Sequence, residues 1–180
     1  MADVEQTLKI GVSACLLGEK VRFDGGHKRD RFVTDILGSW VEFIPLCPEV
    51  EIGLGTPRPS IRLERHGDEV ALVEPRSGTD HTKNMLRFAA RRVSALATMD
   101  LCGYILKSKS PSCGMERVQL WNEKGMGEKK ARGLFAQNLM ESLPLLPVEE
   151  EGRLNDPRLR ENFVERLFAY HRVRKLFSGR

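Results

Sequence analysis

Three short apolar runs, each followed by a loop that carries a cysteine, most constrain the fold of this chain. The runs are LKIGVS at 8–13, WVEFIPL at 40–46 and CGYILK at 102–107. Each has the length of a buried strand, and each leads into a segment rich in Gly, Pro or Ser, which is typical of loops. The cysteines in these loops are Cys15, Cys47 and Cys113. The chain must therefore fold so that three separate strands end in sulfur-bearing loops.

Segments with helical periodicity alternate with the apolar runs. Between residues 79 and 100 the apolar positions recur at intervals of three and four, which predicts one apolar helix face made of Met85, Leu86, Ala89, Val93, Leu96 and Ala97. Residues 131–143 predict a second amphipathic helix. A third is predicted over 157–177, where Asp156 can cap the helix and Pro157 can start it.

The remaining patterns complete the predicted fold. Alternation on both sides of HGDE predicts a hairpin over residues 61–75, and short strands are predicted within 115–122 and 143–151. Strands that alternate with helices indicate an α/β fold. We predict a Rossmann-like, mostly parallel sheet with helices on both faces, a small hairpin and a C-terminal helix.

Charge is unevenly distributed along the chain. Residues 151–180 hold eight of the 29 basic residues and four of the 25 acidic residues, which leaves 21 of each in residues 1–150. We predict a boundary in EEEGRLNDP, with one domain at 1–150 and a linker and helix at 151–180. A basic tail indicates an anionic partner such as RNA, although a solvated helix face explains the same charge.

The sequence predicts a cytoplasmic protein without a membrane partner. It has no run of about 18 apolar residues, and its N-terminus lacks the pattern of a secretory signal. In the cytoplasm, four cysteines favour metal binding or catalysis over disulfides. The sequence does not indicate an oligomeric state.

The three loop cysteines predict a shared metal centre. In a parallel α/β sheet, the loops beyond the carboxyl ends of the strands converge on one crevice. Spacing alone equally allows scattered cysteines, and it leaves both zinc and a four-iron cluster with one open iron as candidates. Cys102 begins an apolar run and is expected to be a buried core residue.

Polar residues beside the cysteines are candidates for acid–base catalysis and for substrate binding. Glu49, two residues after Cys47, is a candidate general base for water, the alternative being a surface glutamate. Ser110 and Ser112 can either close a turn or donate to a substrate or to cluster sulfides. Asp24 in RFDGG is either a ligand contact or part of a plain surface turn.

Four motifs in one order carry a resemblance to a known family. SACLLG, RFDGG, CPE followed by GLGTPRP, and KSKSPSCG resemble the 2-thiouracil desulfurase family over residues 8 to about 145. The resemblance implies a [4Fe-4S] cluster with one open iron site and non-redox removal of sulfur from a thiolated pyrimidine. It implies that the cluster ligands are Cys15, Cys47 and Cys113.

The same resemblance assigns further roles. It implies Glu49 as the catalytic carboxylate and Ser110 as a catalytic serine. We expect the substrate to be contacted by Ser13, Asp24, Gly25 and Ser112.

The C-terminal segment RENFVERLFAYHRVRKLF resembles the beginning of a second domain that longer relatives use with RNA. Such relatives look like tRNA 4-thiouridine desulfidases, so residues 151–180 are expected to be the truncated start of an RNA-associated domain. The expected substrates are 4-thiouridine in tRNA or as a nucleoside or nucleotide, and free 2-thiouracil. The alternative function is a zinc- or cluster-binding module for redox sensing or interaction, attached to an RNA-binding domain.

Overall fold

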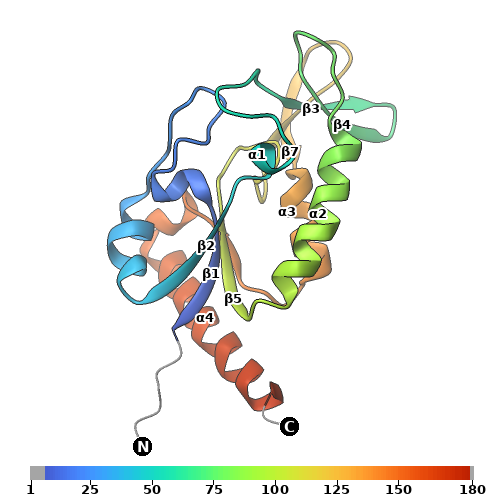
Figure 1. The fold of residues 1–180 in the computed structure, drawn as a ribbon. Coiled ribbons are helices and arrows are strands. Elements are labelled where there is room, and N and C mark those ends of the chain that lie inside the picture. Colours follow the sequence, from blue (N-terminus) through green and yellow to red (C-terminus); the bar gives the residue numbers. More distant parts are fainter. Residues whose placement is uncertain (1–6, 179–180) are drawn as a thin grey trace, which may run out of the picture.

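A parallel four-stranded sheet lies at the centre of the computed structural model, which describes residues 7–178 (Figure 1). The strand order is β2-β1-β5-β8, and all neighbouring strands run parallel. The strands span Leu8–Ser13 for β1, Val41–Leu46 for β2, Leu101–Leu106 for β5 and Val148–Glu150 for β8. The predicted α/β fold with a parallel sheet is confirmed.

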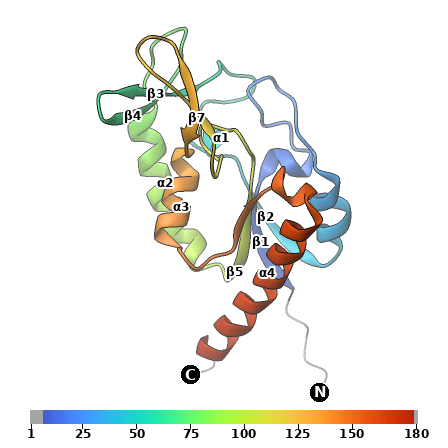
Figure 2. The ribbon, with the colours of Figure 1, turned by 180° about the vertical axis from the view of Figure 1, so that it is seen from behind.

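Helices cover both faces of this sheet because its central strands are apolar on both sides. In β5, Tyr104 and Leu106 belong to one hydrophobic cluster, whereas Cys102 and Ile105 belong to the other. Helices α2 and α3 cover the first face, and α4 with two short turns, η2 and η3, covers the second (Figures 1 and 2). These elements span Thr82–Ala97 for α2, Leu134–Ser142 for α3, Pro157–Ser178 for α4, Phe32–Ile36 for η2 and Leu37–Ser39 for η3.

The apolar face of α2 differs from the prediction at three positions. Leu86 and Ala97 are exposed, whereas Phe88 is buried. Successive helical residues point about 100° apart, so Leu86 turns away from the face that Met85 occupies, and Phe88, three residues after Met85, returns to it. The other predicted members of the face are buried: Met85, Ala89, Val93 and Leu96.

The predicted hairpin is half of a second four-stranded sheet. Strand β3 pairs antiparallel with β4 and parallel with β6, and β6 pairs antiparallel with β7. Strand β7 carries no strand signal in the sequence, because GEKKA is charged and most of it is exposed. The strands span Arg62–His66 for β3, Glu69–Val73 for β4, Val118–Trp121 for β6 and Gly127–Ala131 for β7.

The first half of α4 packs on the parallel sheet. Phe163 and Leu167 are fully buried, and Gly103 of β5 makes room for them, because a Cβ there would lie 2.2 Å from Leu167 Cδ2. Phe168 stacks on Trp40 with ring centroids 5.7 Å apart. The helix therefore packs on this domain, and the assignment of residues 151–180 to the start of an RNA-associated domain stays a prediction.

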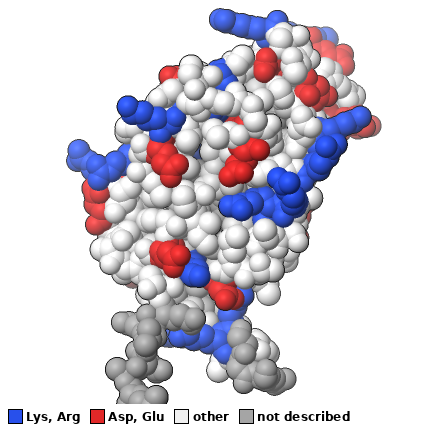
Figure 3. All heavy atoms as spheres, viewed as in Figure 1, with Lys and Arg blue, Asp and Glu red and all other residues white. Residues whose placement is uncertain are grey.

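The surface viewed in Figure 3 mixes both signs of charge. Basic side chains gather over α2, where Lys83, Arg87 and Arg91 are exposed. Within residues 7–178, none of the helices has the length and apolar character required to cross a membrane.

Candidate functional site

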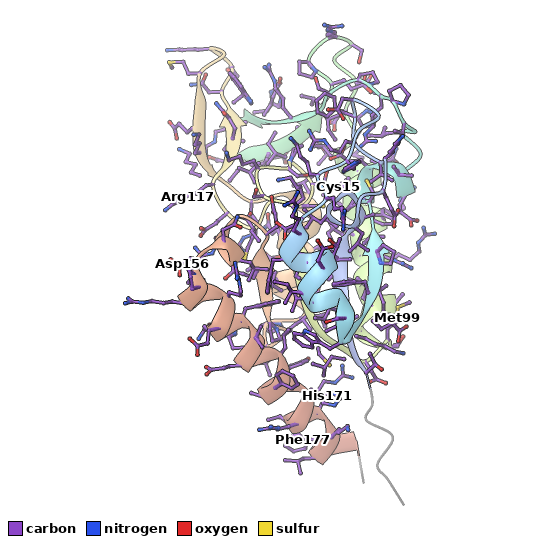
Figure 4. The ribbon with its side chains drawn as sticks, turned by 90° about the vertical axis from the view of Figure 1, so that its left-hand side faces the viewer. Cys15, Met99, Arg117, Asp156, His171 and Phe177 are labelled. Carbon is purple, nitrogen blue, oxygen red and sulfur yellow. The ribbon has the colours of Figure 1, made fainter. Side chains whose placement is uncertain are left out.

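A cavity of about 610 Å³ opens at the carboxyl ends of β1, β2 and β5. It is bounded by the short 3₁₀ helix η1 (Ala14–Leu17), by helix α1 (Pro48–Glu51), and by the loops that follow Gly18, Gly53 and Leu106. Figure 4 shows Cys15 at this end of the sheet, where the loops gather, and His171 toward the other end. Parallel strands bring their carboxyl ends to one edge, which is why these distant loops meet.

The structure brings the three predicted cysteine ligands to this cavity. Cys15, Cys47 and Cys113 all line it, and all are free thiols. Cys15 lies in η1, two residues after β1 ends, and Cys47 directly precedes α1. Cys102 lies elsewhere, with its Sγ 3.3 Å from Nδ1 of His171, and is buried as expected for a core residue.

Burial keeps the three cavity thiols neutral. It raises the pKa of Cys15 to about 11 and raises the pKa values of Cys47 and Cys113, that of Cys113 most of all. Ionised Cys47 would further raise the pKa of both other thiols, so the three lie close enough to interact. Three thiolates here, two of them buried and that of Cys47 half-buried, would repel one another and lack full solvation. They therefore need a cation to become thiolates together.

The sulfur donors at the cavity suit an iron–sulfur cofactor by their chemistry. Among residues 7–178, no three His, Cys, Asp or Glu side chains come close enough to share one metal ion. Three free thiols nevertheless line one cavity, and cysteine thiolates are the usual ligands of iron–sulfur clusters.

Glu49 is held rigidly at the cavity wall. Its Oε2 accepts hydrogen bonds from Arg58 Nη2 at 2.6 Å and from Arg58 Nε at 3.0 Å. Its Oε1 accepts a hydrogen bond from the Ser112 hydroxyl at 2.6 Å. The Arg58 side chain is only 3% exposed, so this ion pair is largely removed from water. Charge-assisted contacts on both oxygens fix the position of the carboxylate.

Arg58 was not among the predicted site residues. Besides Glu49, its Nη1 donates to the carbonyl oxygens of Val21 at 2.9 Å and Gly55 at 2.8 Å. Arg58 thus connects the loop before RFDGG, the GLGTPRP loop and the carboxylate of Glu49. The sequence does contain one signal for Arg58. This residue lies between Pro57 and Pro59, and two prolines restrict the backbone on both sides of the arginine.

The serines of the site have different surroundings. Ser110 lines the cavity, and its Oγ accepts hydrogen bonds from the backbone N–H groups of Ser112 at 3.2 Å and Cys113 at 3.0 Å. Ser13 also lines the cavity, and its Oγ accepts from the N–H of Lys107 at 2.9 Å. Ser112 is fully buried and is not among the cavity-lining residues. Its hydroxyl is therefore placed to orient Glu49.

The RFDGG motif reaches the cavity through its first two residues. Arg22 and Phe23 line it, with the guanidinium 5.5 Å from the ring centroid. Asp24 and Gly25, predicted as substrate contacts, form the adjacent turn outside the lining, where Asp24 Oδ1 accepts from the N–H of Gly26 at 3.0 Å. That hydrogen bond, with the nearby Arg22, lowers the pKa of Asp24.

The start of α3 supports the Cys113 loop, which we define as residues 107–116. The N–H groups of Phe135 and Ala136 both donate to the carbonyl oxygen of Ser112, at 3.0 and 3.1 Å. The N–H of Gly133 donates to the carbonyl oxygen of Gly114 at 2.8 Å. A Cβ on Gly133 would lie 2.5 Å from the carbonyl group of Ser112 and 2.8 Å from the N of Cys113. Only glycine therefore lets the loop approach so closely.

Gly133→Ala is expected to displace the loop and to lower the free energy of unfolding by about 1–3 kcal/mol. The backbone of Gly133, at φ −64° and ψ 143°, suits alanine, so the whole effect would come from the steric contact. Urea denaturation of the cluster-free chain measures it. Gly152→Ala is the matched control, because its Cβ would meet only Ser108 Oγ, at 3.7 Å. Equal midpoints for the two variants would contradict the assigned contact.

Three comparisons show which known proteins this chain is similar to. The family model described as 2-thiouracil desulfurase matches residues 10–151. The uncharacterized protein YbbK of Bacillus subtilis (strain 168) is 31% identical over 108 residues, which cover 57% of this chain and 71% of YbbK. A solved structure of the [4Fe-4S]-dependent thiouracil desulfidase TudS is similar with a TM-score of 0.68 and 33% identity, covering 87% of this chain and 98% of TudS.

Proposed function

The chain belongs to the 2-thiouracil desulfurase family, and from that premise we propose that it hydrolyses a thiolated pyrimidine with the help of a [4Fe-4S] cluster. The reaction exchanges a thiocarbonyl for a carbonyl: the substrate and water give uracil or uridine and hydrogen sulfide. Atoms balance without an oxidant or a reductant. One observation carries the proposal. The carboxylate of Glu49, which Arg58 and Ser112 hold in place, lines the same cavity as three free thiols.

The cysteines are the proposed cluster ligands. Cys15, Cys47 and Cys113 would hold three irons as thiolates, and no fourth cysteine lines the cavity among the residues that the structure describes. When bound, the cluster supplies an open iron that accepts the soft sulfur of the substrate and draws electrons from the attached carbon. The remaining chemistry falls to the side chains of this chain.

Glu49 is the proposed general base. Oε1 accepts only the Ser112 hydrogen bond, so its second lone pair can take a proton from a water at the cavity wall, whereas both positions on Oε2 are occupied by Arg58. The two contacts fix where that proton is taken up, and general-base catalysis depends on such positioning. The protonated Glu49 can then return the proton to the departing sulfur.

Ser110 is proposed to act through its position at the cavity. Its Oγ accepts two backbone hydrogen bonds, which leaves its O–H free to donate into the cavity toward the developing oxygen of the substrate. Ser13 is proposed as a second polar contact there.

The rim of the cavity suits a pyrimidine with an anionic group. Phe23 is 42% exposed although it lines the cavity, which makes its ring available for stacking on a base. Arg22, Lys28 and Lys109 also line the cavity and supply positive charge. We therefore propose that 4-thiouridine, particularly as a nucleotide, is accepted as well as free 2-thiouracil. A ribose and phosphate at the rim would also come within reach of Asp24 and Gly25.

Thiolated tRNA is the most demanding proposed substrate. The C-terminal half of α4, which carries Arg172, Arg174 and Lys175, lies far from Cys15 along the long axis of the molecule (Figure 4). RNA held there must extend along the domain to place a base in the cavity, and the basic row on α2 is a second surface that it can contact (Figure 3). Small thiopyrimidines need no such path, so they are the proposed primary substrates of residues 1–180.

The deciding experiment is an anaerobic assay of sulfide release by the reconstituted chain. The substrates are 2-thiouracil, 4-thiouridine, 4-thiouridine monophosphate and tRNA that contains 4-thiouridine. Multiple turnovers are expected with at least one of the first three, and faster turnover is expected for the monophosphate than for the nucleoside. A protein that holds four irons and four sulfides but releases no sulfide from any of them would be a sensor, and one zinc without inorganic sulfide would make it an interaction module.

A further inference from the structure

Three consecutive glutamates near the end of β8 have a structural position that their sequence does not suggest. The stretch EEEGRLNDP is charged and contains Gly and Pro, which is typical of a linker. Yet Glu149 and Glu150 are each only 6% exposed, and the side chain of Glu151 is only 12% exposed. Burying a carboxylate is costly unless hydrogen bonds or opposite charges satisfy it. The partners of these residues therefore show what the burial accomplishes.

Glu151 binds the beginning of the Cys113 loop. Its Oε2 accepts from the N–H of Ser108 at 2.7 Å, and its Oε1 accepts from the Ser108 hydroxyl at 2.8 Å. The Nζ of Lys107 donates to the same Oε1 at 2.5 Å. One carboxylate thus fixes the backbone and side chains of two successive residues, directly where the chain leaves β5.

Glu150 binds the end of the same loop. Its Oε1 accepts from the N–H of Met115 at 2.6 Å and from the N–H of Glu116 at 3.4 Å. Cys113 lies between the two attachment points, five residues after Ser108 and two before Met115. Because β8 pairs in parallel with β5, its end lies beside the start of the loop, and the side chains of two adjacent residues can reach the two ends.

Glu149 completes the arrangement with a different partner. Its Oε1 accepts from Arg153 Nε at 2.7 Å, and Arg153 Nη1 reaches Glu116 at 3.1 Å. Glu149 therefore anchors the segment that follows β8, and it has no recorded contact with the loop among the described residues. The two carboxylates that contact the loop are those of Glu150 and Glu151.

We propose that Glu150 and Glu151 are positioning residues, which hold the two ends of the Cys113 loop and so direct the Cys113 thiol into the cavity. The proposal rests on the proposed function, in which Cys113 is a cluster ligand. Neither glutamate lines the cavity, so each would act through the loop and not on the substrate. Residues that orient a metal ligand typically change metal affinity or activity by about 10–100-fold when they are replaced.

The test compares Glu150→Ala and Glu151→Ala with Glu123→Ala, a control in the exposed turn between β6 and β7. In the full chain without cluster, iodoacetamide labelling of each cysteine is followed by peptide mass spectrometry. Labelling of Cys113 is expected to be about tenfold faster in both variants than in the control. Cys102, in the other hydrophobic cluster, reports unfolding of the whole domain and should keep its rate.

A second measurement uses the reconstituted protein. A chelator should remove the cluster about tenfold faster from Glu150→Ala and Glu151→Ala than from Glu123→Ala. Glu150→Gln keeps an oxygen that can accept from Met115 and should restore most of the difference. Unchanged Cys113 labelling, or an equal rise at Cys102 and Cys113, would overturn the proposal. Neither labelling result depends on sulfide release, so the proposal can fail while the proposed function stands.

Discussion

Cys113→Ala is expected to abolish cluster binding and sulfide release while the chain stays folded. Cys113 lies at 6% exposure in a loop that is held by Glu150, by Glu151 and by the start of α3, none of which uses its sulfur. Loss of one thiol from a set of three would leave two ligands, which is too few to retain a four-iron cluster. The fold itself should lose only about 1–2 kcal/mol, the usual scale for removing a small buried side-chain group.

Iron and acid-labile sulfide per chain, together with the visible absorption of the cluster, measure the first effect, and urea denaturation measures the second. Cys102→Ala is the matched control, since it removes another buried thiol from the same chain, outside the cavity. It should keep iron, sulfide and activity. Cys15→Ala and Cys47→Ala should behave like Cys113→Ala. A Cys113→Ala protein with four irons would remove Cys113 from the ligand set.

The parallel sheet could be predicted because its signals are local. The strands β1, β2 and β5 are short apolar runs that end in loops, and α2 repeats its apolar residues with helical spacing. Strand β7 could not be found this way. Its stability comes from hydrogen bonds with β6 and not from apolar side chains, and it appears only when its partner is known. The exposure of Leu86 likewise depends on the helix phase, which the nearby apolar residues Met85 and Phe88 obscure in the sequence.

The residues of the candidate site also fall into two groups: those that local sequence signals predict, and those that only the folded structure identifies. Cys15, Cys47, Cys113 and Glu49 follow strand ends, and the rule that parallel strands converge places them together before any coordinates are known. Arg58, Glu150 and Glu151 could not be assigned, because each acts through partners more than 30 residues away or through the backbone of another loop. A charged residue in a Gly- or Pro-rich stretch usually lies in solvent. Only the tertiary contacts in the structure identify the charged residues of such stretches that are buried and bind another loop.

Glu49→Gln is expected to lower kcat for sulfide release by at least about 100-fold while the cluster remains bound. Glutamine keeps the size of the side chain and can still accept a hydrogen bond from Ser112, but it cannot take a proton from water. Iron and sulfide content should equal that of the unmodified chain, because Glu49 is not a proposed ligand. Glu51→Gln is the matched control: it lies two residues later in α1 and is exposed, so its activity should be unchanged.

The same substitution has a structural cost that must be separated from the chemical one. It leaves Arg58, 3% exposed, without its counter-charge, and breaking a buried ion pair from one side costs about 3–5 kcal/mol. The double variant Glu49→Gln/Arg58→Met removes both charges and should recover most of that stability in urea denaturation. If Glu49 is the base, the double variant stays inactive although it is stable. Recovery of sulfide release together with stability would instead mean that Glu49 serves only to hold Arg58 and the loops that it joins.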